Sequence, residues 1–107
     1  MKRLELGDGA QVEAPSAGTV RDAVGNLSAR VEFVVLRETA GGFVQAAWGP
    51  SADLPPGRYL LETKGDHVDG HMQTEATDVD QLAAAFLSFL EEDWTWVDEF
   101  TWVQRTA

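Results

Sequence analysis

The segment from Val79 to Leu90 carries the strongest apolar pattern in the chain. Apolar side chains recur there at helical spacing and cover more than half of the girth. They are Val79, Leu82, Ala83, Phe86, Phe89 and Leu90, widened by Ala84, Ala85 and Leu87. Asp78 can cap this helix, Gln81 completes a capping-box pattern, and we expect the helix to end near Asp93. So wide an apolar face needs a large apolar surface to cover it, which the rest of the chain must provide.

Four β-type segments before this helix can provide that surface. They are Val31–Glu38, Phe43–Trp48, Arg58–Lys64 and His71–Thr77. The first is apolar near its middle on both faces, which is typical of a central strand with cover on part of each face. Short turns join successive strands, apart from a proline-rich loop at residues 49–57, and such connections favour an antiparallel meander.

Three weaker elements complete the expected fold. Lys2–Leu6 and Ala10–Ala14 flank an Asp-Gly turn and predict a short hairpin. Apolar residues at helical spacing predict a short helix within Ser16–Leu27, with Thr19 as its cap, and Glu99–Arg105 alternates like a last strand. Together these elements predict an α+β fold: an antiparallel sheet of about five to six strands with two helices, the C-terminal helix packed on one sheet face. The length of 107 residues fits a single domain at 1–107.

The charge balance restricts the partners of the chain. Eight basic residues stand against eighteen acidic residues, a net charge of −10. Such a charge repels nucleic-acid phosphates and anionic lipid headgroups, and it favours a basic protein partner. The chain has no cysteine, its first residues lack the apolar core of a signal peptide, and no apolar run approaches the ~20 residues of a membrane-spanning helix. We therefore expect a cytoplasmic location.

The sequence shows no pattern of a catalytic or metal site. His67 and His71 are four residues apart, but Asp69-Gly70 between them predicts a turn, and we expect both histidines to face solvent. No serine has the context of a nucleophile, no glycine pattern predicts a phosphate or dinucleotide loop, and the paired carboxylates gather near the chain end. We therefore predict no enzyme activity, no metal and no cofactor.

The tryptophans near the C-terminus are the most informative feature for function. Trp94, Trp96, Phe100 and Trp102 fall within nine residues, and Asp93, Asp98 and Glu99 are interleaved with them. Aromatic anchors beside carboxylates are typical of a surface that binds a basic partner, since a cationic side chain can pair with both. The candidate partner-binding residues are Glu91, Glu92, Asp93, Trp94, Trp96, Asp98 and Glu99. Phe100 and Trp102 fit a core role better, whereas Trp94 and Trp96 fit either role equally.

The order of these segments also suggests a family. Residues 16–103 contain these segments in order: a short helix, a strand with FVVL, a hairpin with FVQAAWG, a strand with YLLE, a strand with His71, a helix after Asp78 and a closing Phe100-Thr101-Trp102. This arrangement resembles small bacterial immunity proteins of polymorphic toxin systems, and related uncharacterised actinobacterial proteins. The resemblance implies a cytoplasmic protein that binds a cognate toxin without catalysis. It carries over no functional residue, because these families share no catalytic motif.

Two other functions remain open from the residues alone. The first is a small enzyme or ligand-binding domain with a pocket between the sheet and a helix, which would need polar groups converging there. The second is a homodimeric accessory protein, joined through a strand edge or through an open face of the sheet. Exposure of the acidic tryptophan segment is the feature that would favour partner binding over both.

Overall fold

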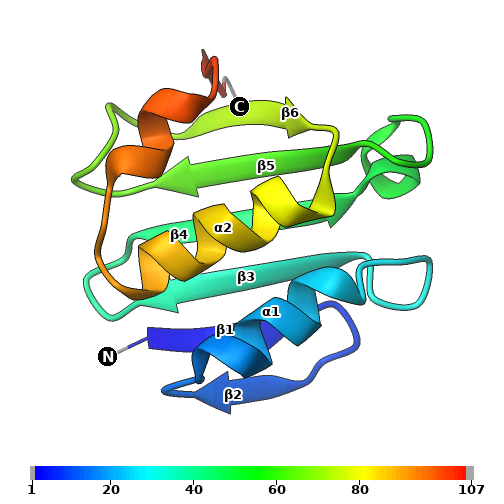
Figure 1. Ribbon diagram of the computed structural model, residues 1–107, viewed down its shortest axis with the longest axis horizontal. Coiled ribbons are helices and arrows are strands. Elements are labelled where there is room, and N and C mark those ends of the chain that lie inside the picture. Colours follow the sequence, from blue (N-terminus) through cyan, green and yellow to red (C-terminus); the bar gives the residue numbers. More distant parts are fainter. Residues whose placement is uncertain (1, 106–107) are drawn as a thin grey trace.

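The computed structural model describes residues 2–105, which form one antiparallel sheet of seven strands in the order β2-β1-β3-β4-β5-β6-β7 (Figure 1). The strands are β1 (Lys2–Leu6), β2 (Gln11–Glu13), β3 (Phe33–Glu38), β4 (Phe43–Trp48), β5 (Tyr59–Lys64), β6 (Met72–Ala76) and β7 (Val103–Gln104). The predicted α+β class and the meander from β3 to β6 are confirmed. The sheet is slightly wider than the predicted five to six strands, because β1 pairs with β3 and brings the N-terminal hairpin into it.

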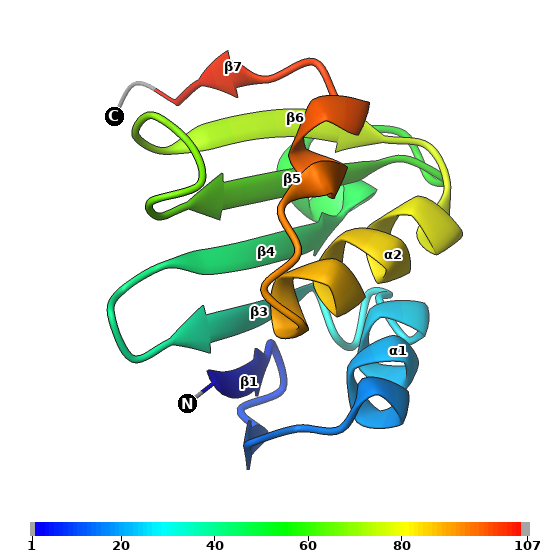
Figure 2. The same ribbon diagram turned by 60° about the vertical axis from the view of Figure 1, so that its left-hand side comes forward.

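Two helices, α1 (Ala17–Gly25) and α2 (Val79–Leu90), lie side by side on the same face of the sheet (Figure 2). Asp78 caps α2 as predicted, by accepting a 2.8 Å hydrogen bond from the backbone N–H of Asp80. The cap predicted for α1 was wrong. Ser16, rather than Thr19, is the capping residue, and its hydroxyl accepts the backbone N–H of Thr19.

The core lies between this helical layer and the sheet. It contains Val20 and Val24 of α1, Leu82, Ala85, Phe86 and Phe89 of α2, and inward side chains of the strands such as Leu4, Leu36, Val44 and Leu61. Side chains of the core fill the space between sheet and helices. No helix among residues 2–105 is long and apolar enough to cross a membrane.

The chain returns across the sheet edge after α2. The predicted strand over Glu99–Arg105 is only partly correct, since a 3-10 turn, η2 (Thr95–Glu99), occupies its start and only Val103 and Gln104 pair with β6. Trp102 explains the difference: its Nε1 donates a 2.7 Å hydrogen bond to the carbonyl of Val97, and its ring packs against the core. This packing holds the turn in place, and the strand therefore begins only at Val103.

In the described part of the chain, residues 2–105, neither α1 nor α2 covers the second face of the sheet (Figure 2), and we call it the open face. A short 3-10 helix, η1 (Gly49–Ala52), lies at its rim. Successive side chains of a strand point to opposite faces of the sheet. Five of the eight basic residues and five of the eighteen acidic residues therefore lie on the open face or at its rim. These are Arg3, Arg37, Arg58, Lys64 and Arg105, and Glu5, Glu13, Asp53, Glu62 and Glu75. The open face is therefore close to neutral, and the whole net charge of −10 lies elsewhere on the molecule.

Candidate functional site

The end of α2 is built around a strained residue. The backbone N–H of Asp93 bonds the carbonyl of Ser88, and that of Glu92 bonds the carbonyl of Phe89, which together form a Schellman motif. Its left-handed position is usually glycine, but here it holds Glu92 with φ 59°. A residue with a β-carbon costs on the order of 1 kcal/mol or more in this conformation. This arrangement sends the chain sharply away from the helix and brings Trp94 beside α2.

Trp94 is the exposed aromatic side chain of the predicted segment. Its indole stacks on the imidazole of His67, with ring centroids 4.6 Å apart and planes 12° apart. The same indole and the ring of Phe89 are in a T-shaped arrangement, with centroids 5.4 Å apart and planes 74° apart. Trp94 nevertheless keeps 36 % of its surface exposed. The indole is thus held in place by two rings while part of it remains available to a partner.

A hollow of about 450 Å³ lies beside this stack and is lined by Glu38, Asp66, His67, Glu92 and Trp94. We call it the Trp94 hollow. Three carboxylates from three parts of the chain meet there: the end of β3, the β5–β6 turn and the end of α2. Carboxylates around an aromatic ring are the environment that a guanidinium or ammonium group prefers.

His67 connects the hollow to the sheet. The hydroxyl of Thr63 donates a 2.8 Å hydrogen bond to the carbonyl of Phe43, so His67 Nε2 must donate to the Thr63 oxygen, at 2.6 Å. Nδ1 is then the nitrogen that would take up a proton. Burial lowers the pKa of His67, and the nearby carboxylates of Glu38 and Asp66 partly oppose that shift.

The remaining predicted carboxylates are exposed but differ in their relation to the hollow. Glu91 and Asp93 flank Glu92 in sequence, whereas Asp98 and Glu99 lie on η2 and are not among the residues that line the hollow. Asp93 accepts hydrogen bonds from the backbone N–H and the hydroxyl of Thr95, which lower the pKa of its carboxyl. It therefore stays anionic into the acidic range.

The structure separates the two tryptophans that the sequence left undecided. Trp96 is 2 % exposed and belongs to the core, where its ring lies 5.9 Å from that of Trp102. The exposure that partner binding requires is present at Trp94 and absent at Trp96, so placing Trp96 among the binding residues is corrected. Phe100 and Trp102 are partly buried against the core, as their expected role requires.

Three residues of the hollow were missed from the sequence: Glu38, Asp66 and His67. The predicted meander contains a signal for them. In an antiparallel meander the β3–β4 and β5–β6 turns lie at the same end of the sheet, and the C-terminal end of a covering helix can meet them there. Nothing local to these residues distinguishes them from ordinary turn residues.

The expectation that both histidines face solvent was wrong. His67 is half-buried beneath Trp94, and His71 Nε2 lies 3.0 Å from a carboxylate oxygen of Glu62, which is itself 2 % exposed. Arg105 pairs with the other oxygen of Glu62. Both oxygens of this buried carboxylate are therefore occupied. Among residues 2–105 no group of three or more His, Asp or Glu side chains is arranged to hold a metal ion.

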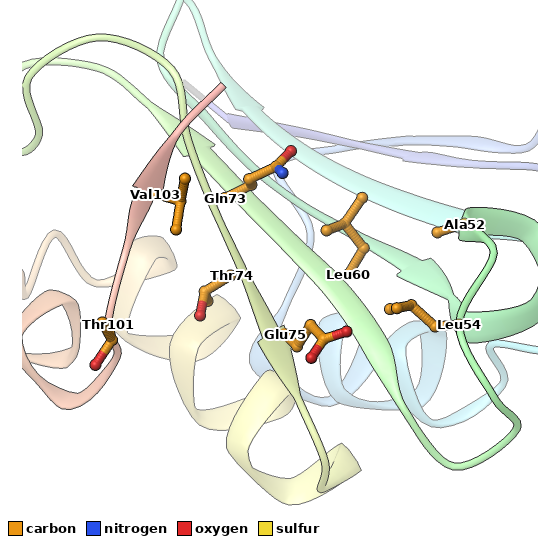
Figure 3. Close-up of a pocket in the computed structure, with 8 residues that line it drawn as sticks. All are labelled: Ala52, Leu54, Leu60, Gln73, Thr74, Glu75, Thr101 and Val103. Carbon is orange, nitrogen blue, oxygen red and sulfur yellow. The ribbon is translucent and has the colours of Figure 1, made fainter. Parts of the chain in front are cut away.

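A second hollow lies on the open face. It has a volume of about 610 Å³ and runs between the loop with Ala52 and Leu54 and the strand with Val103, over Leu60 and Gln73 (Figure 3). Its lining is mixed, with Thr74, Glu75 and Thr101 at one end. This hollow is on the open face of the sheet. The ligand pocket considered from the sequence would lie on the other face, between the sheet and the helices.

Comparisons of this chain with protein-family models, with curated proteins and with solved structures found no match.

Proposed function

We propose that this protein is a non-catalytic binding domain that receives a cationic side chain of a basic protein partner in the Trp94 hollow. The observation that carries the proposal is the placement of Trp94: partly exposed, fixed by His67 and Phe89, and next to three carboxylates. A guanidinium lying on the exposed part of the indole could pair with Glu92, Glu38 or Asp66. A fixed aromatic anchor loses little conformational entropy on binding.

The strain at Glu92 supports the same proposal. Glycine would occupy its left-handed position without strain, yet the chain holds a glutamate there. The ion pair of Glu92 with Lys2, at 3.4 Å, joins a carboxylate side chain that is 67 % exposed to a lysine side chain that is 12 % exposed, so solvent screens the pair on the carboxylate side and it offsets only part of the strain. A role for the carboxylate at the rim of the hollow gives a reason for the strain.

The distribution of charge supports a basic partner as well. Away from the open face, thirteen acidic residues stand against three basic residues, and the Trp94 hollow belongs to this acidic region. Such a field speeds the encounter with a cationic protein. Together with the resemblance to immunity proteins, this makes a cognate toxin with a basic active site the partner that we propose, in the cytoplasm.

Trp94→Ala should weaken binding of this partner by about 2 kcal/mol, close to thirty-fold, mainly through a faster off-rate. The partner is obtained by affinity capture from a lysate of the source organism, identified, purified and measured by surface plasmon resonance. The on-rate of the unchanged protein should fall between 0.1 M and 1 M salt, because the Debye length shrinks from ~10 Å to ~3 Å. An acidic partner, or an off-rate unchanged by Trp94→Ala, would refute the proposal.

Glu92→Gly should separate stability from binding. Removing the β-carbon relieves the left-handed backbone, so the free energy of unfolding should stay constant or rise by up to ~1 kcal/mol. Binding of the same partner should weaken, because the hollow loses one of its carboxylates. The matched control is Asp98→Gly, which lies away from the hollow and should leave binding nearly unchanged. Asp78→Gly would not serve as a control, because it also removes the cap of α2. A stabilised variant with unaltered affinity would mean that Glu92 takes no part in binding.

A further inference from the structure

The indole of Trp94 offers one of its two faces to the Trp94 hollow. The imidazole of His67 lies parallel to the indole at 4.6 Å, and the ring of Phe89 lies 5.4 Å from it, between centroids. The centroids of His67 and Phe89 are 5.7 Å apart, much less than the sum of their distances to the indole, so both rings lie toward the same side of it. Neither ring covers the other face, and a planar cation placed there would continue the stack.

The carboxylates of the hollow come from separate segments and suit a planar donor. Glu38 ends β3, Asp66 follows β5 and Glu92 follows α2. Glu38 and Asp66 form no ion pair within residues 2–105, so both are available. A guanidinium carries five N–H donors that diverge in one plane, whereas an ammonium is a compact charge that holds its water more strongly. Acceptors spread around a flat ring therefore favour arginine over lysine.

The position of Glu38 depends on a glycine. A β-carbon at Gly42 would lie 2.4 Å from Oε1 of Glu38 and 3.0 Å from its carboxyl carbon, and 3.2 Å from the carbonyl oxygen of Lys64. The carboxylate thus lies against the bare α-carbon of Gly42, in space that a side chain would occupy. The φ of Gly42 is outside the left-handed region, so its backbone does not require glycine. The absence of a side chain is what this position provides.

We propose that the Trp94 hollow selects arginine over lysine, with the guanidinium on the free face of the Trp94 indole and its N–H groups donating to Glu38 and the neighbouring carboxylates. Gly42 is the positioning residue that gives the Glu38 carboxylate its place. This inference rests on the proposed function, and it defines the partner as a protein that presents an exposed arginine. The two side chains carry the same charge, so the acidic field attracts both and the hollow alone discriminates.

Two peptides of equal charge, tetra-arginine amide and tetra-lysine amide, test the selectivity directly. Isothermal titration calorimetry in low-salt buffer should give a dissociation constant at least about five-fold lower for the arginine peptide. In Trp94→Ala the two dissociation constants should become nearly equal, because only general attraction remains. Equal constants in the unchanged protein, no measurable binding of either peptide, or an arginine advantage that persists in Trp94→Ala would overturn the proposal.

Gly42→Ala tests the positioning of Glu38. The added methyl group displaces the carboxylate, so the arginine advantage should fall to about half or less while the circular dichroism spectrum stays unchanged. Glu38→Gln should reduce the advantage as well, and the double variant should reduce it no further, because both changes act through one carboxylate. Gly25→Ala, where a β-carbon would meet nothing within 4 Å, is the matched control and should keep the full advantage. Additive effects, or a full advantage in folded Gly42→Ala, would refute this role of Gly42.

The outcomes separate the selectivity from the proposed function. Equal binding of the two peptides, together with a captured basic partner that loses affinity in Trp94→Ala, would remove the preference for arginine and leave the proposed function standing. An arginine preference that depends on Trp94, together with a captured partner that is acidic, would support the selectivity and remove the proposed partner.

Discussion

Phe86→Ala should lower the free energy of unfolding by about 3–5 kcal/mol, the usual cost of emptying a buried phenylalanine site. Phe86 is fully buried at the middle of α2, where it belongs to the core formed by both helices and the sheet. The core residues of both helices and the sheet relax only partially around an emptied site, so a cavity remains and adds to the loss. Urea unfolding followed by circular dichroism measures the loss, with the slope of the transition checked for constancy.

Gln81→Ala is the control for this variant. Gln81 is exposed on the same helix, and alanine is a good helix former, so the change should stay within ~0.5 kcal/mol. A loss of less than ~1 kcal/mol in Phe86→Ala would mean that α2 does not cover the core as the structure describes. The paired variants thus separate the packing contribution of the helix from its intrinsic propensity.

The parts of the fold with a local signal were predictable from the sequence. The apolar stripe of α2 repeats at helical spacing within one segment, and the four strands from β3 to β6 are each marked by a short β-type segment bounded by turn or loop residues. The pairing of β1 with β3 joins segments about thirty residues apart, with a helix between them, and no local pattern specifies it. The short β7 was overestimated for a related reason: the alternation near Phe100 and Trp102 arises from packing around a turn and not from a strand.

The candidate site was predictable to a similar extent. The acidic tryptophan segment pointed to Glu92 and Trp94, because a run of carboxylates there directly precedes an aromatic residue. The contributions of Glu38, Asp66 and His67 depend on two turns meeting the end of α2, which is a tertiary arrangement. Which of Trp94 and Trp96 points outward depends on the left-handed turn at Glu92 and on η2, and neither follows a regular period.

Trp96→Ala should destabilise the protein by about 3–5 kcal/mol, comparable with Phe86→Ala, because it also empties a large buried site. Trp96 is 2 % exposed and lies within 5.9 Å, between ring centroids, of both His67 and Trp102. Its loss removes contacts that hold the returning C-terminal segment against α2. Urea unfolding of Trp96→Ala and Trp94→Ala side by side should show a large loss for the first and a much smaller one for the second.

Trp96→Phe distinguishes the loss of apolar packing from the loss of the indole N–H. Within residues 2–105 the Nε1–H of Trp96 is buried and has no hydrogen-bond partner, an arrangement that costs roughly 1–3 kcal/mol in folded proteins. Phenylalanine keeps an aromatic ring and removes this cost, which offsets part of the packing that the smaller ring loses, so the variant should lose clearly less stability than Trp96→Ala. A loss as large as that of Trp96→Ala would show instead that the packing of the full indole, and not its N–H, determines the contribution of Trp96. An unfolding free energy unchanged in Trp96→Ala would place this tryptophan outside the core and return it to the binding surface beside Trp94.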